Sequence, residues 1–559
     1  MKKSSPHARV LAYCGIVTAL LFSFFLMFHT FSYNADKHHI QIASKLWSDF
    51  GAHIPLIRSF SYGPNTQRLL QGKPIESPLF PGEPIRYHFG FYAVVGLLEK
   101  IGMRIDWALN SISALGFFLL LRALFRFSRV LFSSIAISVL SVLFFIFNGS
   151  LSFLAFFQQH PINPSTFIDI ISNSKFPSFG PWDNGLVTAF WNLNIYTNQR
   201  HLALSYGLVF FILYLLYQPQ KKSQIIGVAI GISTAMLLFI NFAAAGIAAL
   251  FLGWAFIIKK DTRASIVFAS IIIIPAVFVL RALSYTSSPV TWQPGYLSPQ
   301  PTPSSFLLFW FHNLGLHSIL IPIGVLCAPK HIRRFLAPPL IILFILPNLF
   351  KFSADMINNH KFFNFFLALG NIFSAYAVVL LIKLWNTVRN KWLKKLARGL
   401  TAAVLITLLT LSGFIDLFPI FNDTKGSIFD IPANPDAQFF LSNTHPTEVI
   451  ANSTWFYHPA SIAGRSVLSG YTYFTWSYGY KQVERERALS QIYEADSITG
   501  VCTAARQSGV THIELNQNPE SYLLPNLRIW QTITPLYENP ESHLRIYKVA
   551  DICADNAHE

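Results

Sequence analysis

Long apolar runs recur along the chain between residue 11 and about residue 420, and they constrain the fold more than any other feature of the sequence. A run of about 20 apolar residues is long enough to cross the hydrocarbon core of a bilayer as a helix. Only 12% of the 559 residues are charged, about half the share found in soluble globular domains. The sequence therefore predicts an α-helical polytopic membrane protein.

A change to ordinary mixed composition near residue 420 predicts a domain boundary. We expect a transmembrane domain over residues 1–420, with a large first outer loop at 32–105, and a small α/β domain over 421–559. Strand-like runs in the second domain lie at 448–451, 511–515 and 544–549, and a helix with charges four residues apart is expected at about 481–494.

Clusters of Lys and Arg between the apolar runs predict the topology, because basic loops remain in the cytoplasm. The strongest cluster lies at 383–398. The other clusters lie at 122–129, 221–222, 259–263 and 330–334, and they alternate with longer loops at about 149–200, 285–303 and 351–361. This alternation predicts about eleven spans in the plasma (inner) membrane, with a cytoplasmic N-terminus and an extracytoplasmic C-terminal domain.

Three further expectations follow from hydropathy and charge. The N-terminal apolar run to about Phe31 resembles a signal sequence without a convincing cleavage site, and we interpret it as an uncleaved first span. The run 223–258 is too long for one span and is expected to form a hairpin near Asn241. The formal net charge of +16 is distributed over the loop clusters, so it does not indicate nucleic acid as a partner.

The apolar run 88–103 conflicts with the alternation of basic loops if it is counted as a span. We therefore expect it to lie on the outer membrane surface as an amphipathic helix. Glu99, Lys100 and Arg104 would form its polar end.

Candidate catalytic residues lie in the first outer loop. Asp49 and His53 are four residues apart, so on a helix both would face the same side. Asp36, just beyond the first span, is a second candidate carboxylate. The alternative is that Asp49 only caps a surface helix and that His53 is incidental.

The order of motifs around these residues resembles a known family. Asp49-x-x-x-His53 is followed by Ile57–Gly63, a proline-rich stretch, Pro84–Tyr92 and an apolar helix. This order is similar to that of the GT-C superfamily of integral membrane glycosyltransferases, which includes protein O-mannosyltransferases and lipid A aminoarabinose transferases. Stricter subfamilies often show an Asp-Glu pair, whereas Phe50 follows Asp49 here.

The resemblance implies a hexosyl or pentosyl transferase of the cell envelope with a polyprenyl-phosphate sugar as donor. It implies an inverting reaction in which Asp49, or else Asp36, deprotonates a hydroxyl of a glycan, lipid or protein acceptor. It also implies that no metal ion or other cofactor is required.

The donor phosphate needs cations at the bilayer surface, and Arg is suited to this role by its planar, bidentate guanidinium. Asn198–His201 and Asn358–Lys361 each precede an apolar run. The candidates for phosphate binding are Arg200, His201, His360 and Lys361, together with Arg86 and His88 in the first outer loop. The alternative is that Arg200 and Lys361 extend from helix ends toward water.

In the C-terminal domain, Arg465 and the aromatic residues Tyr473 and Trp476 are candidates for contact with a glycan. The same aromatic density is also typical of a domain that rests on the membrane interface. Cys502 and Cys553 both fall in this domain, where an oxidising compartment would allow a disulfide, although two unrelated thiols remain the alternative.

Two other classes of function remain open. The sequence has no Walker loop, no GxGxxG after a strand, no HExxH and no paired CxxC, which argues against ATP-driven pumping and nucleotide-cofactor chemistry. A transporter or flippase of a lipid-linked glycan would show ionisable residues at mid-membrane. A non-catalytic membrane scaffold that binds glycans is the other alternative.

Overall fold

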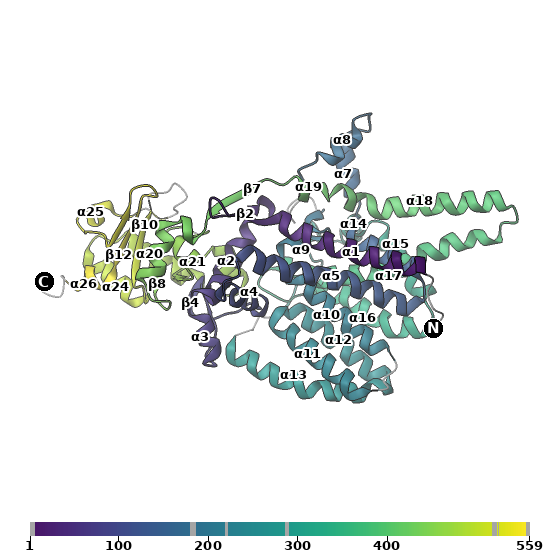
Figure 1. Ribbon diagram of the computed structural model, residues 1–559, viewed down its shortest axis with the longest axis horizontal. Coiled ribbons are helices and arrows are strands. Elements are labelled where there is room, and N and C mark those ends of the chain that lie inside the picture. The colour runs from purple at the N-terminus through teal and green to yellow at the C-terminus, as the bar shows by residue number, and fades with distance from the viewer. Residues whose placement is uncertain are drawn as a thin grey trace. The chain divides into compact units, whose positions relative to one another are not determined.

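The chain is mostly helical, and its contacts group it into two units (Figure 1). The computed structural model describes residues 6–178, 186–218, 222–284, 290–454, 456–516, 523 and 525–554. The helical unit comprises Met1–Thr30, Ser111–Val277 and Val290–Thr424, and the mixed unit comprises Phe31–Asn110, Phe278–Pro289 and Lys425–Glu559. Lys221 and parts of the predicted loops 149–200 and 285–303 lie outside the described residues.

Seven helical segments among the described residues are long and apolar enough to cross a membrane, so the chain is a polytopic membrane protein. A bent pair, α14 (Pro303–Leu314) and α15 (His317–Cys327), makes an eighth if its 86° bend lies within one span. The seven segments are Tyr13–Thr30 of α1 (Pro6–Thr30), Ile105–Phe132 (α5), Ser223–Ile240 (α11), Lys260–Leu283 with α13 (Arg263–Leu283), Lys330–Leu349 (α16), Met356–Thr387 with α17 (His360–Leu384), and Lys391–Phe421 with α18 (Lys391–Ile415) and α19 (Phe418–Phe421).

Three shorter apolar helices accompany these segments in the helical unit: α6 (Ile135–Ile146), α10 (Leu202–Tyr217) and α12 (Phe242–Ile258). The predicted turn near Asn241 is confirmed, because this residue separates α11 from α12, which pack against each other. The Asn241 side chain accepts a hydrogen bond from the amide of Ala244 at 3.0 Å. This N-cap satisfies one of the free amides with which α12 begins.

The mixed unit contains a five-stranded sheet in the order β11-β12-β10-β8-β9. Strand β8 is parallel to β9 and β10, whereas β12 is antiparallel to β10 and β11. The strands are β8 (Val449–Ala451), β9 (Ser466–Val467), β10 (His512–Asn516), β11 (Tyr537–Asn539) and β12 (Leu544–Lys548). The strand-like runs predicted from the sequence thus appear as β8, β10 and β12, and the predicted helix as α23 (Gln482–Tyr493).

Segments far apart in the sequence meet in the mixed unit. Strands β1 (Phe31–Asn34) and β2 (His39–Ala43) form an antiparallel hairpin, and β7 (Lys425–Phe429) pairs with β2. Helices α24 (Ile498–Gln507) and α26 (Val549–Ala554) are joined by a disulfide between Cys502 and Cys553, with 5.8 Å between their Cα atoms.

The mixed unit contains a buried group of three charges. Arg58, in the last turn of α2 (Trp47–Ser61), contacts Glu99 of α4 (Gly90–Lys100) at 3.1 Å and Asp430 at 2.7 Å. Ser61 donates a hydrogen bond to Glu99 at 2.6 Å. Helix α4 is not among the segments that could span a membrane, but Glu99 is buried and paired rather than part of a polar helix end. The interpretation of Glu99 as an interfacial charge is therefore wrong.

Loss of Arg58 should destabilise the protein strongly, because two carboxylates would remain buried without their cation. We expect Arg58→Met to lower the free energy of unfolding by about 3–5 kcal/mol. The matched control is Arg545→Met, which removes an equally short pair with Glu538 (2.8 Å) that is exposed and should cost less than about 1 kcal/mol. Denaturant titration of both variants in detergent measures the difference, and equal losses would contradict this account of the triad.

Candidate active site

Asp49 lies in the first turn of α2 and is half-buried. The first turn of a helix carries a partial positive charge from its free amides, and this charge stabilises a carboxylate. His53, one turn further on, is buried, and its ring centroid lies 4.7 Å from that of Tyr92 of α4. The helix predicted around Asp49 and His53 is therefore present, with the carboxylate at its more exposed end.

The charge of Asp49 acts on three tyrosines of the mixed unit. Burial raises the pKa of Tyr87, Tyr457 and Tyr478 well above that of a free phenol, and the negative charge of Asp49 raises the pKa of each further. All three phenols are therefore neutral at physiological pH and can donate hydrogen bonds. They come from three separate segments of the mixed unit: the residues after β4 (Phe80–Pro84), the loop before α21 (Pro459–Ile462) and the end of α22 (Thr472–Ser477).

The loop at 456–457 is held closely against the start of α2. Tyr457 donates a hydrogen bond to the carbonyl of Trp47, and the two ring centroids are 4.6 Å apart. Tyr457 has a φ of 51°, a left-handed conformation that is strained for a residue with a side chain. A Cβ atom on Gly51 would lie 2.2 Å from the Phe456 ring, so the absence of a side chain at Gly51 permits this contact.

A small cavity of about 20 Å³ lies beside these residues and is lined in part by His53, Ser77, Tyr87 and Tyr478. A cavity of this size holds about one water molecule. This cavity is therefore too small to hold a sugar ring.

The structure separates the two candidate carboxylates. Asp36 is exposed in the turn between β1 and β2, whereas α2 begins after β2 and a short helical turn. Strand β2 and this helical turn therefore lie between the two carboxylates in the chain.

Arg86 and His88 occupy different surroundings in the mixed unit. The Arg86 guanidinium lies over the Tyr480 ring at 4.8 Å, pairs with Glu83 at 3.3 Å and donates to the carbonyl of Gly479. His88 is buried, and its ring centroid is 3.7 Å from that of Tyr87. His88 therefore adjoins one of the tyrosines near Asp49.

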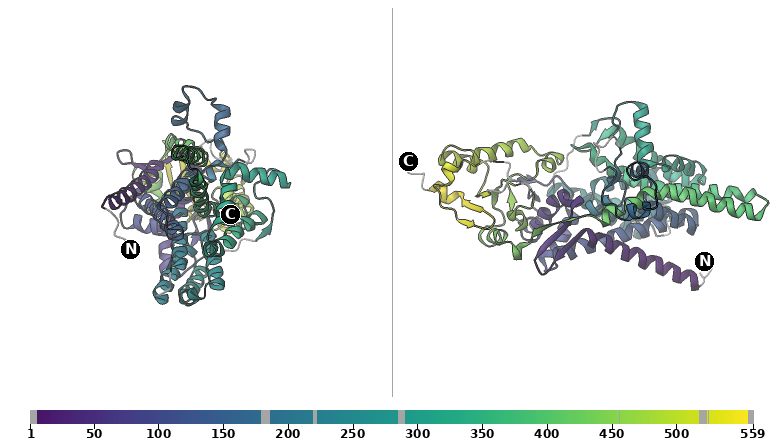
Figure 2. Two further views of the ribbon diagram at one scale, coloured as in Figure 1. Left: turned by 90° about the vertical axis from the view of Figure 1, so that its right-hand side faces the viewer. Right: turned by 90° about the horizontal axis from the view of Figure 1, so that it is seen from above.

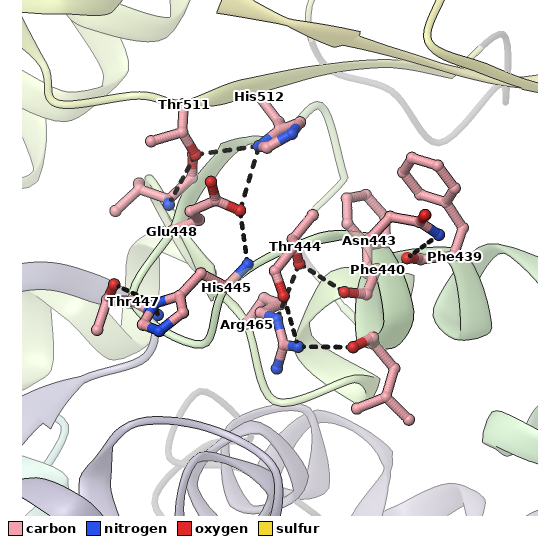
Figure 3. A network of polar contacts seen from close by, with 12 residues as sticks. Phe439, Phe440, Asn443, Thr444, His445, Thr447, Glu448, Arg465, Thr511 and His512 are labelled. Carbon is pink, nitrogen blue, oxygen red and sulfur yellow. Dashed lines mark hydrogen bonds and ion pairs between the residues drawn. The ribbon is translucent and has the colours of Figure 1, made fainter.

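Arg465 is buried in a network of backbone acceptors, part of which is drawn in Figure 3. Its Nε donates to Thr444 Oγ1 at 2.8 Å, and its Nη atoms donate to the carbonyls of Tyr62, Leu441, Thr444 and Ala463 at 2.9–3.1 Å. Five donors thus meet five acceptors, so Arg465 stabilises the end of α20 (Pro435–Asn443). Tyr473 and Trp476 of α22, by contrast, are 40% and 43% exposed.

In the helical unit, the two predicted cation clusters lie at the starts of α10 and of α17 (His360–Leu384). Arg200 is fully buried and lies at the end of α1, where it donates to the Met27 carbonyl at 3.3 Å and to Thr30 Oγ1 at 2.9 Å. His201 is buried at the start of α10. Tyr206 of α10 donates to the carbonyl of Lys361, so the first turns of α10 and α17 are neighbours.

His360 and Lys361 begin α17. The His360 ring stacks on Phe190 at 5.1 Å, and its Nδ1 lies 3.3 Å from Oδ1 of Asn364. Lys361 Nζ donates to Oδ1 of Asn358 at 3.4 Å. Arg200 and Lys361 are both buried. A side chain that extends from a helix end toward water would be exposed, so the structure does not support that alternative.

Sequence reasoning missed several of these groups. Nothing in the local patterns around Tyr87, Tyr457 and Tyr478 indicates that they share the surroundings of Asp49. A buried carboxylate, Asp416 at the end of α18, was also missed; Asn192 donates to it at 3.2 Å. Among the described residues, no three His, Cys, Asp or Glu side chains are grouped so as to hold a metal ion.

No protein-family model and no curated protein matches the sequence. Among solved structures, a mutant (class 2) of the arabinofuranosyltransferase AftD from Mycobacteria is similar, with TM-score 0.50, 14% identity, and coverage of 96% of this chain and 41% of AftD. ArnT from Cupriavidus metallidurans in the apo state has TM-score 0.49 and 11% identity over 98% of this chain and 99% of ArnT. The oligosaccharyltransferase AglB from Archaeoglobus fulgidus has TM-score 0.43 and 14% identity, over 92% of this chain and 70% of AglB.

These structural neighbours are GT-C glycosyltransferases. The likeness to AftD, at 14% identity, concerns the fold. The GT-C resemblance that the motifs around Asp49 indicated is therefore confirmed at the level of the fold.

The buried His512 makes a pH dependence testable. It contacts Thr511 Oγ1 at 3.1 Å and lies 3.9 Å from Glu448 (Figure 3), and burial lowers its pKa despite the nearby carboxylates of Glu448 and Asp551. On acidification the unfolded chain therefore binds a proton at this position before the folded chain does, and stability falls as the pH drops below about 6.5.

Through His512, the wild-type protein should lose up to about 1.4 kcal/mol of its free energy of unfolding per pH unit. We expect His512→Asn to abolish this part of the acid-dependent loss. Urea unfolding of the wild-type protein and the variant between pH 7.5 and pH 5 gives the two slopes. His543→Asn, at an exposed histidine, is the matched control. Identical slopes for wild type and His512→Asn would refute the assignment.

Proposed function

We propose that this protein is a membrane glycosyltransferase that moves a sugar from a polyprenyl-phosphate donor to a hydroxyl group of an extracytoplasmic acceptor. The observation that carries the proposal is the half-buried carboxylate of Asp49, placed at the start of α2, whose charge helps to keep three phenols of the same unit protonated. The fold it shares with an arabinofuranosyltransferase supports the proposal.

In the proposed reaction, Asp49 accepts the proton of the acceptor hydroxyl as its oxygen attacks the anomeric carbon. The bond from that carbon to the phosphate oxygen breaks, and the phosphate leaves with the electron pair. Attack opposite the leaving group inverts the anomeric configuration. Tyr87, Tyr457 and Tyr478, as neutral donors, hold the acceptor or the carboxylate in place, and His53 orients α2 through its contact with Tyr92.

Negative charge develops on the leaving phosphate in the transition state, and nearby cations stabilise it. The acceptor hydroxyl is neutral and needs such cations less. We assign this role first to Lys361 and Arg200, with His201 and His360 beside them, and secondarily to Arg86 and His88. Their burial supports the assignment, because charge-assisted hydrogen bonds are stronger at low dielectric. The proposal requires no metal ion or other cofactor.

The proposed topology has a cytoplasmic N-terminus and an extracytoplasmic domain at 421–559, in the plasma (inner) membrane. Its eleven spans would be the seven long segments, the bent pair α14–α15 and the three shorter apolar helices. The exposed rings of Tyr473 and Trp476 would contact a glycan acceptor.

Asp49→Asn tests the proposed base, because it preserves the shape of the side chain and removes its basicity. We expect normal folding and donor binding, with transfer slower by about 10²–10⁴-fold. Transfer of radiolabelled sugar from a panel of polyprenyl-phosphate sugars to membrane acceptors measures this loss. Asp36→Asn is the matched control, and His53→Ala should reduce the rate less than Asp49→Asn.

If Asp36→Asn abolishes transfer while Asp49→Asn remains active, the base is Asp36. If both variants are fully active, the first outer loop is not the catalytic centre. Movement of lipid-linked sugar between leaflets without transfer would favour the flippase alternative.

Lys361→Met tests the proposed phosphate site. Loss of a charge-assisted hydrogen bond of about 1.5–3 kcal/mol should lower kcat/KM for the donor by about 10–100-fold, and Lys361→Arg should restore part of it. The matched control is Lys383→Met, which removes an exposed charge from the other end of α17. Unchanged donor dependence in Lys361→Met would show that this lysine does not bind the phosphate.

A further inference from the structure

Helices α7 (Ser152–Gln159) and α8 (Thr166–Ile171) form an arm, residues 152–171, that projects sideways from the helical unit (Figures 1 and 2). The arm runs across the direction of α1, α5 and α18. Its outer part exposes large apolar side chains: Ile162 is 81% exposed, Phe167 65% and Ile168 61%. Such a group of exposed apolar side chains indicates an interaction surface.

The base of the arm is attached to the end of α18. Phe156 and Ile170 form a small apolar core with Ile415 of α18. The Asn422 side chain donates hydrogen bonds to the carbonyls of Ile171 and Asn173 at 2.8 and 2.9 Å. The orientation of the arm relative to α18 is thus set by both apolar packing and hydrogen bonds.

The face of α18 that receives the arm is the face that α18 exposes along the rest of its length. Leu400, Val404 and Leu408 are exposed large apolar residues spaced four apart, so they form one stripe. Leu411 and Ile415 continue this stripe by the helical period, and both contact the core of the arm. Because an exposed apolar stripe on a membrane-spanning helix faces lipid, the arm is attached to the lipid-facing side of α18.

Several polar groups near the tip of the arm have partners within the arm itself. The amide of Ser165 donates to Asn163 Oδ1 at 2.7 Å, and the Ser165 hydroxyl lies 3.2 Å from Asp169 Oδ2. The amide of Asn163 donates to Thr166 Oγ1 at 2.8 Å. Backbone and side-chain polar groups that enter a membrane interface need such internal partners.

We propose that the arm inserts Ile162, Phe167 and Ile168 into the bilayer at the depth where α18 ends, and that its partner is the lipid bilayer itself. The continuous apolar stripe of α18 specifies this partner, because a protein partner would not require the arm to extend from a lipid-facing surface. The inference does not depend on the proposed catalytic activity.

The test places an environment-sensitive NBD fluorophore on the arm of the full-length protein in phosphatidylcholine proteoliposomes. The exposed free cysteines are first replaced by Cys14→Ser and Cys327→Ser, which leaves the Cys502–Cys553 disulfide in place. Labelled Ile168→Cys is compared with Val404→Cys, on the lipid-facing stripe, and with Thr503→Cys, at an exposed position of α24. Phe167→Cys replaces Ile168→Cys if the latter does not fold.

We expect the label at residue 168 to show blue-shifted emission and to be quenched more strongly by doxyl groups near the headgroup than by deeper ones. The label at 404 should be quenched by deeper groups, and the label at 503 should not be quenched. Emission at 168 equal to that at 503 would overturn the proposal. A blue shift without doxyl quenching would also overturn it, because it would indicate a protein partner or a second copy of the chain.

Discussion

The buried guanidinium of Arg58 is the contact on which the mixed unit depends. Burial opposes its charge, but Glu99 and Asp430 more than offset this effect and leave the pKa of Arg58 above its usual value. Removing Arg58 would leave two carboxylates without their cation in a low dielectric, so its contacts hold α2, α4 and the residue after β7 together. Because Arg58 lies near one end of α2 and Asp49 near the other, the ion group also determines where the candidate base is held.

The environment of Asp49 separates two roles that acid–base chemistry requires. The first turn of α2 stabilises a negative charge, whereas burial keeps the nearby phenols of Tyr87, Tyr457 and Tyr478 neutral. One group can therefore accept a proton at a pH at which its neighbours still donate hydrogen bonds. The strained backbone of Tyr457 is consistent with this role, since such conformations persist only where the surrounding contacts impose them.

Features that depend on neighbouring residues in the sequence were predictable, and features that depend on distant pairing were not. Hydropathy and charge predicted a polytopic membrane protein, the turn at Asn241 and the strands β8, β10 and β12, because each has a local period or a local cap. By contrast, Arg58 and Asp430 are 372 residues apart, and Tyr457 meets Trp47 across 410 residues. The assignment of Glu99 to the membrane interface failed for the same reason. A charge at a helix end is typical of an interfacial helix, and the local sequence does not reveal its partner Arg58. No local pattern could have shown that Arg465 is occupied by backbone carbonyls.

Two buried cations of the helical unit, Arg200 and Lys361, lie beside the starts of helices. Arg200 donates to the Met27 carbonyl and the Thr30 hydroxyl, and Lys361 donates to the Asn358 amide oxygen. Arg200 lies just before α10 and Lys361 lies in the first turn of α17, so the positive end of a helix dipole adds to each cation. A positive field in a low dielectric favours an anion that arrives from the bilayer, and a lipid phosphate is such an anion.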